Sequence, residues 1–495
     1  MIKAVRVLEK YWWLCSIIVI IIAGCWISYI GTQQAIWFDE NYSITLARQS
    51  FADILSLTGV DAHPPLYYLL LKIWANSFGW SEFSLRLMSV IVASAGMFVA
   101  VALTRHLFSA KVALAVMPFI AFAPFIVRYG YEVRMYALAF LIGVLATYVL
   151  VKARSRKVSS IWLWSTYAVL VAAGMYTLYM TLVIWLAHLL WIVFTTNQKR
   201  SLIRSPMILS YAGAVLLFLP YLPTFIYQNL HSALPGVGSE LTLTRLVNTF
   251  SMLTVYTPEW QLGGWISLVL ILAIILFGMA VYQIRKTPQY QGVILLATLV
   301  VVPTIFFAAV SLPPRTPIYI ERYMAHISVY YYLLITTVAV LWINKSKDWK
   351  SYSLLISIAT FAIVGNFQLL AAGNLNYERL QLPETKELRK SVSCNNNMTI
   401  VADDPYTYID SEYYFRDCNL TFYSESDVAY RGGYAPLHKS PQRIENPSSI
   451  HTDTLVHLRW DKPESDFHAV EAYQLVETRS YGKQIVDVYK RANEG

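Results

Sequence analysis

The sequence predicts a polytopic α-helical membrane protein, with about eleven spans, that ends in a small α/β domain. Three observations predict this fold class. Hydrophobic residues make up 56% of the 495 residues and charged residues only 14%, whereas soluble domains carry about 25% charge. Many apolar runs reach ~18–22 residues, which is long enough to cross a bilayer. Beyond residue 371 these runs stop, and a charged, turn-rich segment follows.

The predicted spans are the long apolar runs between residues 11 and 371. The first run follows a short basic start, residues 1–10, without an evident small-residue cleavage site. We therefore expect a retained first helix rather than a cleaved signal peptide. The predicted spans are 11–31, 83–106, 111–128, 135–151, 160–176, 179–196, 206–226, 264–284, 291–311, 323–343 and 352–371.

Charges in the connecting loops predict the orientation. Basic residues cluster in alternate loops, for example 152–157 and 199–204, and nearly all acidic residues of the first 371 positions fall in the other loops. By the positive-inside rule, the N-terminus is cytoplasmic and the acidic loops are outside. An odd number of spans places the tail outside as well. We expect a protein of the plasma (inner) membrane. The net charge of +9 does not indicate nucleic-acid binding, because the basic residues sort to one side.

Two short helices are expected in the first outer loop. The apolar run 65–78 is interrupted by Lys72 and is shorter than the ~17 residues that a spanning helix needs. It suits an interfacial or re-entrant helix on the outer surface. Residues 50–58 suit another short helix, with Ser50 as its N-cap and Asp53 at position N3.

The same loop carries residues suited to chemistry. Asp39 and Glu40 are adjacent just after the first span, and Asp61 and His63 precede a pair of prolines that closes the loop. Adjacent carboxylates at a membrane surface indicate acid/base or metal chemistry. The alternative is a water-exposed polar loop.

Three further outer loops hold candidate residues. Residues 128–136 contain Arg128, Glu132 and Arg134, and Glu132 either serves a functional site or forms a structural ion pair with one of the arginines. Residues 312–322 contain Arg315 and Arg322, which either bind phosphate through the planar guanidinium or snorkel to lipid headgroups. Residues 227–263 are rich in Gly and Pro and suit a mobile lid; His231, Glu240 and Glu259 lie there.

The tail, residues 372–495, predicts a small α/β domain. Helices are expected at 383–392 and 406–416, strands at 398–402, 420–423 and 455–458, and a hairpin from 473–477 and 484–489. Asp403 and Asp404 end the first strand and serve either a ligand or a turn or helix cap. Cys394 and Cys418 flank the first strand–helix unit, so a disulfide is expected if the tail is extracytoplasmic.

Several soluble-enzyme motifs are absent from the sequence. No P-loop or Gly-rich dinucleotide fingerprint stands at a strand–helix junction, and neither a Cys/His zinc spacing nor a G-x-S-x-G elbow occurs. A soluble nucleotide-sugar or ATP site is therefore not supported.

Four strings, taken in order, resemble the GT-C superfamily of membrane glycosyltransferases. The similar branch contains the protein O-mannosyltransferases and the lipid A aminoarabinose transferases. The strings are WFDENY after the first span, HPPLYYLLLKIW at 63–74, SEFSLRLMSV at the start of the next span and RYGYEVRMYAL in the second outer loop. The resemblance covers residues 1–150 well. Beyond them it rests on the number of spans, the charged loop 312–322 and the outward tail.

This resemblance implies a reaction. Members of the superfamily move a sugar, hexosyl or pentosyl, from a polyprenyl-phosphate donor to an acceptor hydroxyl on protein, lipid or glycan at the outer membrane face, normally with inversion. Residues 1–371 would then form the catalytic membrane domain, and 372–495 an extracytoplasmic domain. The expected partners are the lipid-linked donor, the acceptor and membrane lipids, without nucleic acid.

The resemblance also implies residue roles. Asp39 would be the general base, and Glu40 and Glu132 would orient hydroxyls. Alternatively, Asp39 and Glu132 would hold a divalent cation such as Mg²⁺ or Mn²⁺. His63 stands where some relatives have a lysine that contacts the donor phosphate, and this departure leaves its role open. The remaining phosphate candidates are Arg128, Arg134, Arg315 and Arg322.

Two other functions are open alternatives. A transporter or flippase of lipid-linked glycans would favour charged residues deep within spans and internal repeats, and neither is clear in this sequence. A non-catalytic binder of such glycans would not need Asp39, Glu40 and Glu132.

Overall fold

The computed structural model describes residues 2–155, 160–195, 206–231, 242–256, 264–312, 321–371, 383–461, 467 and 472–492. Two compact units make up the chain. Unit 1 consists of Met1–Gly31, Phe83–Pro223 and Leu234–Ala371, and unit 2 consists of Thr32–Glu82, Thr224–Ala233 and Ala372–Gly495. The first outer loop therefore belongs to the same unit as the C-terminal domain. The predicted division into a catalytic and an extracytoplasmic domain at residue 371 stays a prediction.

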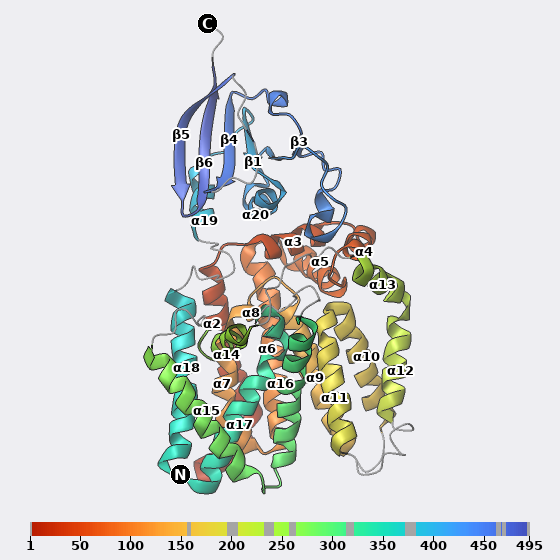
Figure 1. Ribbon diagram of the computed structural model, residues 1–495, viewed down its shortest axis with the longest axis vertical. Coiled ribbons are helices and arrows are strands. Elements are labelled where there is room, and N and C mark those ends of the chain that lie inside the picture. Colours follow the sequence, from red (N-terminus) through yellow and green to blue (C-terminus); the bar gives the residue numbers. More distant parts are fainter. Residues whose placement is uncertain are drawn as a thin grey trace. The chain divides into compact units, whose positions relative to one another are not determined.

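Unit 1 is a bundle of mostly long apolar helices (Figure 1). Its α-helices are α1 (Ile2–Lys10), α2 (Trp12–Thr32), α6 (Glu82–Leu107), α7 (Ala110–Ala121), α8 (Pro124–Gly130), α9 (Tyr136–Ser155), α10 (Ile161–Thr177), α11 (Leu182–Thr195), α12 (Pro206–Phe218), α14 (Leu243–Val255), α15 (Gly264–Ile284), α16 (Tyr290–Val310), α17 (Ser328–Ser346) and α18 (Trp349–Ala371). Short 3₁₀ turns are η1 (Tyr179–Thr181), η3 (Leu219–Tyr221) and η5 (Glu321–Ile327).

The predicted polytopic membrane fold is confirmed. Within the described ranges, eight helices are long and apolar enough to cross a membrane, and the bent pair α7 and α8 makes up to nine. Two shorter apolar helices, Ile161–Thr177 and Tyr179–Thr195, stand at the fifth and sixth predicted positions. Helices therefore occupy all eleven positions at which the sequence predicts a span.

The third predicted span is two helices rather than one. α7 ends at Ala121, α8 begins at Pro124, and the two axes differ by 59°. Proline lacks an amide hydrogen and disfavours helical backbone in the residue before it, which accounts for the break. The side-chain amide of Asn366 in α18 donates to the carbonyl of Phe122 at 2.8 Å, so a backbone acceptor at the break has a partner.

A buried polar cluster joins several helices of unit 1. Thr147 Oγ1 lies 3.0 Å from His188 Nε2 and 2.6 Å from the hydroxyl of Tyr330. The hydroxyl of Tyr167 lies 2.9 Å from His188 Nδ1. These four side chains are 0% exposed, and their mutual bonds satisfy groups that would be costly to bury alone.

The segments Thr32–Glu82 and Thr224–Ala233 of unit 2 contain four helices, the last of which begins in unit 1. They are α3 (Phe38–Arg48), α4 (Phe51–Val60), α5 (Leu66–Phe78) and, at the start of the Thr224–Ala233 segment, α13 (Leu222–His231). The helix expected at 50–58 is confirmed by α4. Its expected N-cap is also present, since the Ser50 side chain accepts a hydrogen bond from the Asp53 amide. Lys72 in α5 donates to the carbonyl of Ala47 at 3.4 Å. This hydrogen bond to the end of α3 accounts for the charged residue within the apolar run 65–78.

The C-terminal part of unit 2 is the predicted α/β domain. A mixed six-stranded sheet has the order β3-β2-β1-β4-β6-β5, and β3, β2, β1 and β4 are parallel while β6 is antiparallel to β4 and β5. The elements are α19 (Pro383–Ser391), β1 (Met398–Ala402), α20 (Pro405–Phe415), β2 (Leu420–Tyr423), η6 (Gly432–Leu437), β3 (Arg443–Ile444), η7 (Pro447–Ser449), β4 (Thr454–Trp460), β5 (Tyr473–Tyr481) and β6 (Gln484–Arg491).

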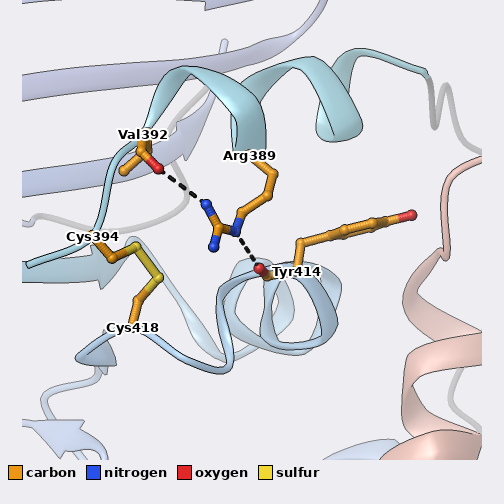
Figure 2. Close-up of a disulfide and its surroundings, with 5 residues drawn as sticks. All are labelled: Arg389, Val392, Cys394, Tyr414 and Cys418. Carbon is orange, nitrogen blue, oxygen red and sulfur yellow. Dashed lines mark hydrogen bonds between the residues drawn. A yellow bond between two sulfur atoms is a disulfide. The ribbon is translucent and has the colours of Figure 1, made fainter. Parts of the chain in front are cut away.

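One face of this sheet carries both tail helices. Leu388 of α19 and Phe415 of α20 share a buried cluster with Val456 of β4. The predicted disulfide between Cys394 and Cys418 is present, with a Cα–Cα distance of 5.6 Å (Figure 2). Beside it, Arg389 donates from Nε to the carbonyl of Tyr414 at 2.6 Å and from Nη1 to that of Val392 at 3.1 Å (Figure 2). The disulfide and Arg389 thus tie α19 and β1 to the end of α20.

Candidate functional site

Helix α3 carries the adjacent carboxylates in its first turn. Asp39 and Glu40 are the two acidic residues there, and the partial positive charge of a helix N-terminus stabilises such groups. Asp39 is half-buried, whereas Glu40 is buried, with 1% of its surface exposed. Asp39 is therefore the more accessible of the two carboxylates within unit 2.

The end of the first outer loop forms a small polar cluster in the same unit. The hydroxyl of Tyr42 donates to Asp61 Oδ2 at 2.6 Å, and His63 Nδ1 lies 3.3 Å from the same oxygen. Burial of the Asp61 carboxyl raises its pKa, but the contacts from His63, Tyr42 and the Ala62 amide outweigh this effect and hold the pKa below its ordinary value. Asp61 is therefore ionised near neutral pH.

This cluster gives His63 a defined orientation. A carboxylate within reach of one ring nitrogen fixes the orientation of the imidazole. The sequence places Asp61 in this loop but assigns it no role at the site. The signal that could have predicted the contact between Asp61 and His63 is their spacing of two residues within the DAHPP string.

Unit 1 contains the second group of predicted residues. Arg128 Nη1 donates to Glu132 Oε2 at 3.3 Å, and both side chains are buried. The guanidinium also lies over the rings of Tyr129 and Tyr131, at 5.1 and 5.4 Å from their centroids. Of the two alternatives for Glu132, the ion pair with Arg128 is thus present, and a functional role stays a prediction.

Backbone contacts hold the same loop in place. The Ser89 hydroxyl donates to the carbonyl of Glu132 at 2.7 Å, and the amide of Arg134 donates to that carbonyl at 2.7 Å. Arg134 is buried, with 3% of its surface exposed. Arg86 lies over the ring of Tyr131 and donates to the carbonyl of Gly31 at 2.6 Å. Residues 128–136 are therefore buried in unit 1 and bonded to α6.

The remaining predicted residues are distributed as follows. Arg322 lies half-buried in η5, and the neighbouring Glu321 accepts a hydrogen bond from Asn248 at 3.1 Å. His231 is exposed at the end of α13. Arg315, Glu240 and Glu259 lie outside the described residues.

The site residues thus fall into two groups, each within one unit. Asp39, Glu40 and His63 belong to unit 2, and Arg128, Glu132, Arg134 and Arg322 belong to unit 1. Among the residues that the structure describes, no three His, Cys, Asp or Glu side chains are close enough together to hold a metal ion. The two residues predicted to hold a divalent cation, Asp39 and Glu132, belong to different units, so the cation stays a prediction.

The acidic pair of the tail has structural partners. The Asp404 side chain accepts a hydrogen bond from the Thr407 amide at 2.7 Å and caps α20. Asp403 Oδ1 lies 3.0 Å from His457 Nε2, and both side chains are buried. The helix-cap alternative is therefore confirmed for Asp404.

Known proteins match both part of the sequence and the fold. Residues 62–227 match the family model described as dolichyl-phosphate-mannose-protein mannosyltransferase. The fold matches ArnT from Cupriavidus metallidurans, with TM-scores of 0.60 for the apo state and 0.58 for the structure bound to undecaprenyl phosphate. Each match covers 95% of this chain and 97% of that chain at 11% identity. The chain has a GT-C fold.

The predicted resemblance to GT-C membrane glycosyltransferases is therefore confirmed, and at this identity the likeness to ArnT concerns the fold. The oligosaccharyltransferase of Archaeoglobus fulgidus in its apo form also matches, with a TM-score of 0.48, 13% identity, 82% of this chain and 64% of that chain. No curated protein matches the chain. The family match includes His63, Arg128, Glu132 and Arg134, whereas Asp39 and Glu40 precede it.

Proposed function

We propose that this GT-C chain is an integral membrane glycosyltransferase that moves a sugar from a polyprenyl-phosphate donor to an acceptor hydroxyl. The observation that carries the proposal is a half-buried carboxylate, Asp39, at the start of α3 in a chain with the fold of ArnT. The donor class is supported by the ArnT structure bound to undecaprenyl phosphate and by the dolichyl-phosphate-mannose family model. The acceptor belongs to protein, lipid or glycan.

We place the reaction at the extracytoplasmic face of the inner membrane. The sorting of basic and acidic loops supports a cytoplasmic N-terminus. The disulfide between Cys394 and Cys418 supports an extracytoplasmic tail, because disulfides persist in oxidising compartments. Since the donor sugar arrives already activated on its lipid, no nucleotide is needed outside the cell.

Asp39 acts as the general base. An alcohol is a poor nucleophile at neutral pH, so a carboxylate must take its proton as it attacks. The acceptor oxygen forms a bond to the anomeric carbon while the bond from that carbon to the phosphate oxygen breaks on the opposite face. The electron pair leaves with the polyprenyl phosphate, and the configuration inverts. Glu40 and Glu132 orient hydroxyl groups of the acceptor or the sugar.

Cationic side chains stabilise the leaving phosphate. His63, whose imidazole lies 3.3 Å from the Asp61 carboxylate, is one candidate. The arginines contribute the others, since a guanidinium donates two parallel hydrogen bonds to phosphate. Arg128 has donors beyond the one that bonds Glu132, because a guanidinium carries five N–H groups. Arg134, Arg315 and Arg322 are the further candidates.

The direct test is transfer by purified protein in detergent. A panel of radiolabelled polyprenyl-phosphate hexoses and pentoses would be offered, with membrane extract as the source of acceptors and with or without EDTA. We expect label to move from one donor to an acceptor. Loss of transfer with EDTA would establish a cation. If every donor stays intact, the proposal is wrong; tight donor binding without transfer then favours the flippase or the non-catalytic binder, and transport in vesicles separates these two.

A further inference from the structure

One face of α3 packs against α20 of the tail. Phe38, Asn41 and Thr45 are spaced by three and four residues, so they lie along one stripe of the helix. The Phe38 ring stacks on that of Tyr406, with centroids 4.6 Å apart and planes 7° from parallel. This stack begins a continuous contact between the two helices.

The next contacts continue along both helices in the same direction. Asn41 donates from its side-chain amide to the carbonyl of Ile409. The Thr45 hydroxyl donates to Glu412 Oε2 at 2.7 Å. Phe38, Asn41 and Thr45 thus contact successive turns of α20.

The start of α3 is also fixed from α20. Trp37, its N-cap, offers no side-chain hydrogen bond to the helix. The backbone amide of Ile36, just before it, donates instead to the hydroxyl of Tyr414 at 2.7 Å. The first turn of α3 thus receives from the tail a constraint that its own sequence does not supply.

The proposed base stands next to these contacts without taking part in the stripe. Asp39 follows Phe38 directly, and successive residues of a helix are rotated by about 100°. Its carboxylate therefore lies on a different face from the Phe38–Asn41–Thr45 stripe. Near the other end of α3, Lys72 of α5 donates a hydrogen bond to the carbonyl of Ala47. The tail thus fixes the end of α3 that carries Asp39.

We propose that α20 is a positioning element for the transfer reaction: its contacts with Ile36, Phe38, Asn41 and Thr45 hold the Asp39 carboxylate where the acceptor hydroxyl is deprotonated. Within the tail, α20 then supports the site by positioning α3, whereas, among the described residues, the strand that carries Tyr473 and Thr478 does not contact α3 in this way. This inference rests on the proposed function of Asp39. A base displaced by about 1 Å costs on the order of 100-fold in rate, so modest loosening of α3 suffices to slow transfer.

The test uses a double substitution that removes two hydroxyls and little volume. Tyr414→Phe removes the acceptor of the Ile36 amide, and Thr45→Val removes the donor to Glu412. The matched control is Tyr473→Phe with Thr478→Val, which removes hydroxyls that bond the Thr452 carbonyl and Asp487 within the tail. Both proteins are compared with wild type in the full-length, detergent-purified form.

Two readouts separate positioning from a merely structural role. Hydrogen exchange of residues 36–48 reports the docking of α3, and kcat and the donor KM report the reaction. For Tyr414→Phe/Thr45→Val we expect faster exchange and a kcat lower by about tenfold or more, consistent with the cost of a displaced catalytic group, with an unchanged donor KM. For the control we expect wild-type values of all three.

The outcomes that contradict the inference are also defined. If exchange rises while kcat stays at the control value, the position of Asp39 does not depend on α20. If neither exchange nor kcat changes, α3 is held without these contacts, and the inference is wrong as well. If wild-type protein transfers no sugar from any donor, the proposed function fails, and exchange of residues 36–48 still shows on its own whether α20 holds α3.

Discussion

Nδ1 of His63 lies 3.3 Å from Oδ2 of Asp61, and that oxygen also accepts a hydrogen bond from Tyr42 at 2.6 Å. The carboxylate is buried, with 3% of its surface exposed, so its charge is poorly screened by water. Asp61 thus orients the imidazole of His63, the residue that we propose contacts the donor phosphate.

Replacing His63 with lysine tests this role. Lysine side chains keep their charge to about pH 10, whereas histidine side chains in general lose theirs near neutral pH. We expect His63→Lys to retain transfer and to extend it to higher pH than wild type. We expect His63→Gln to raise the donor KM most at acidic pH, where histidine side chains in general carry their charge. Profiles of kcat/KM against pH check this. A wild-type profile in His63→Gln would show that His63 does not contact the donor.

The lowered pKa of Asp61 predicts how stability depends on pH. Because the folded protein holds this pKa below its ordinary value of 3.8, ionised Asp61 stabilises the fold above that pH, and this contribution is lost as pH falls through the lowered folded value. Asp61→Asn should therefore lower the thermal unfolding midpoint at neutral pH and flatten its decline on acidification. An equally steep acid decline in Asp61→Asn would contradict the assignment.

The buried pair of Arg128 and Glu132 predicts a large stability effect. Removing one partner of a buried ion pair costs about 3–5 kcal/mol, whereas replacing both with apolar side chains is often neutral. Glu132→Gln should lower the thermal midpoint in detergent more than Arg128→Met/Glu132→Leu does. Glu9→Gln, on the half-buried Glu9 of α1, is the control and should have no comparable effect. Equal midpoints for Glu132→Gln and wild type would show that the pair is not structural.

The disulfide predicts a local stability effect in the tail. It closes a segment with a sequence separation of 24 residues, for which loss of the cross-link costs about 3 kcal/mol. We expect Cys394→Ser/Cys418→Ser to speed hydrogen exchange of α20 and β1. The control is Cys15→Ser/Cys25→Ser, because these two cysteines are free. Equal exchange in both double variants would contradict a role for the disulfide in holding the tail.

Local sequence signals predicted most of the fold. Apolar length placed helices at all eleven span positions, and alternation with turn residues placed β1, β2, β4 and the hairpin of β5 and β6 within a few residues of their bounds. Two features of the membrane part were not predicted. α14 lies in a loop with weak periodicity, and the bend between α7 and α8 results from Pro124 inside an otherwise continuous apolar run.

The environment of the site was less predictable, because it depends on contacts between distant parts of the chain. Asn41 and Ile409 are 368 positions apart, and no local pattern connects α3 with the tail. Asp61 was seen as a loop residue, but its bonds to Tyr42 and His63 arise only once α3 and the end of the loop pack together. The sequence motifs thus indicated the candidate site residues, and the structure shows which side chains and helices contact them.

The most direct measurement compares sugar transfer by wild type, Asp39→Asn and Asp417→Asn in one assay, with the polyprenyl-phosphate donor that wild type uses. Asp417 is exposed in the tail and serves as the matched control. We predict that Asp39→Asn loses transfer while its donor binding and thermal midpoint stay at wild-type values, and that Asp417→Asn is fully active. Near-normal transfer by Asp39→Asn would contradict the account, because the acceptor would then be deprotonated by another group.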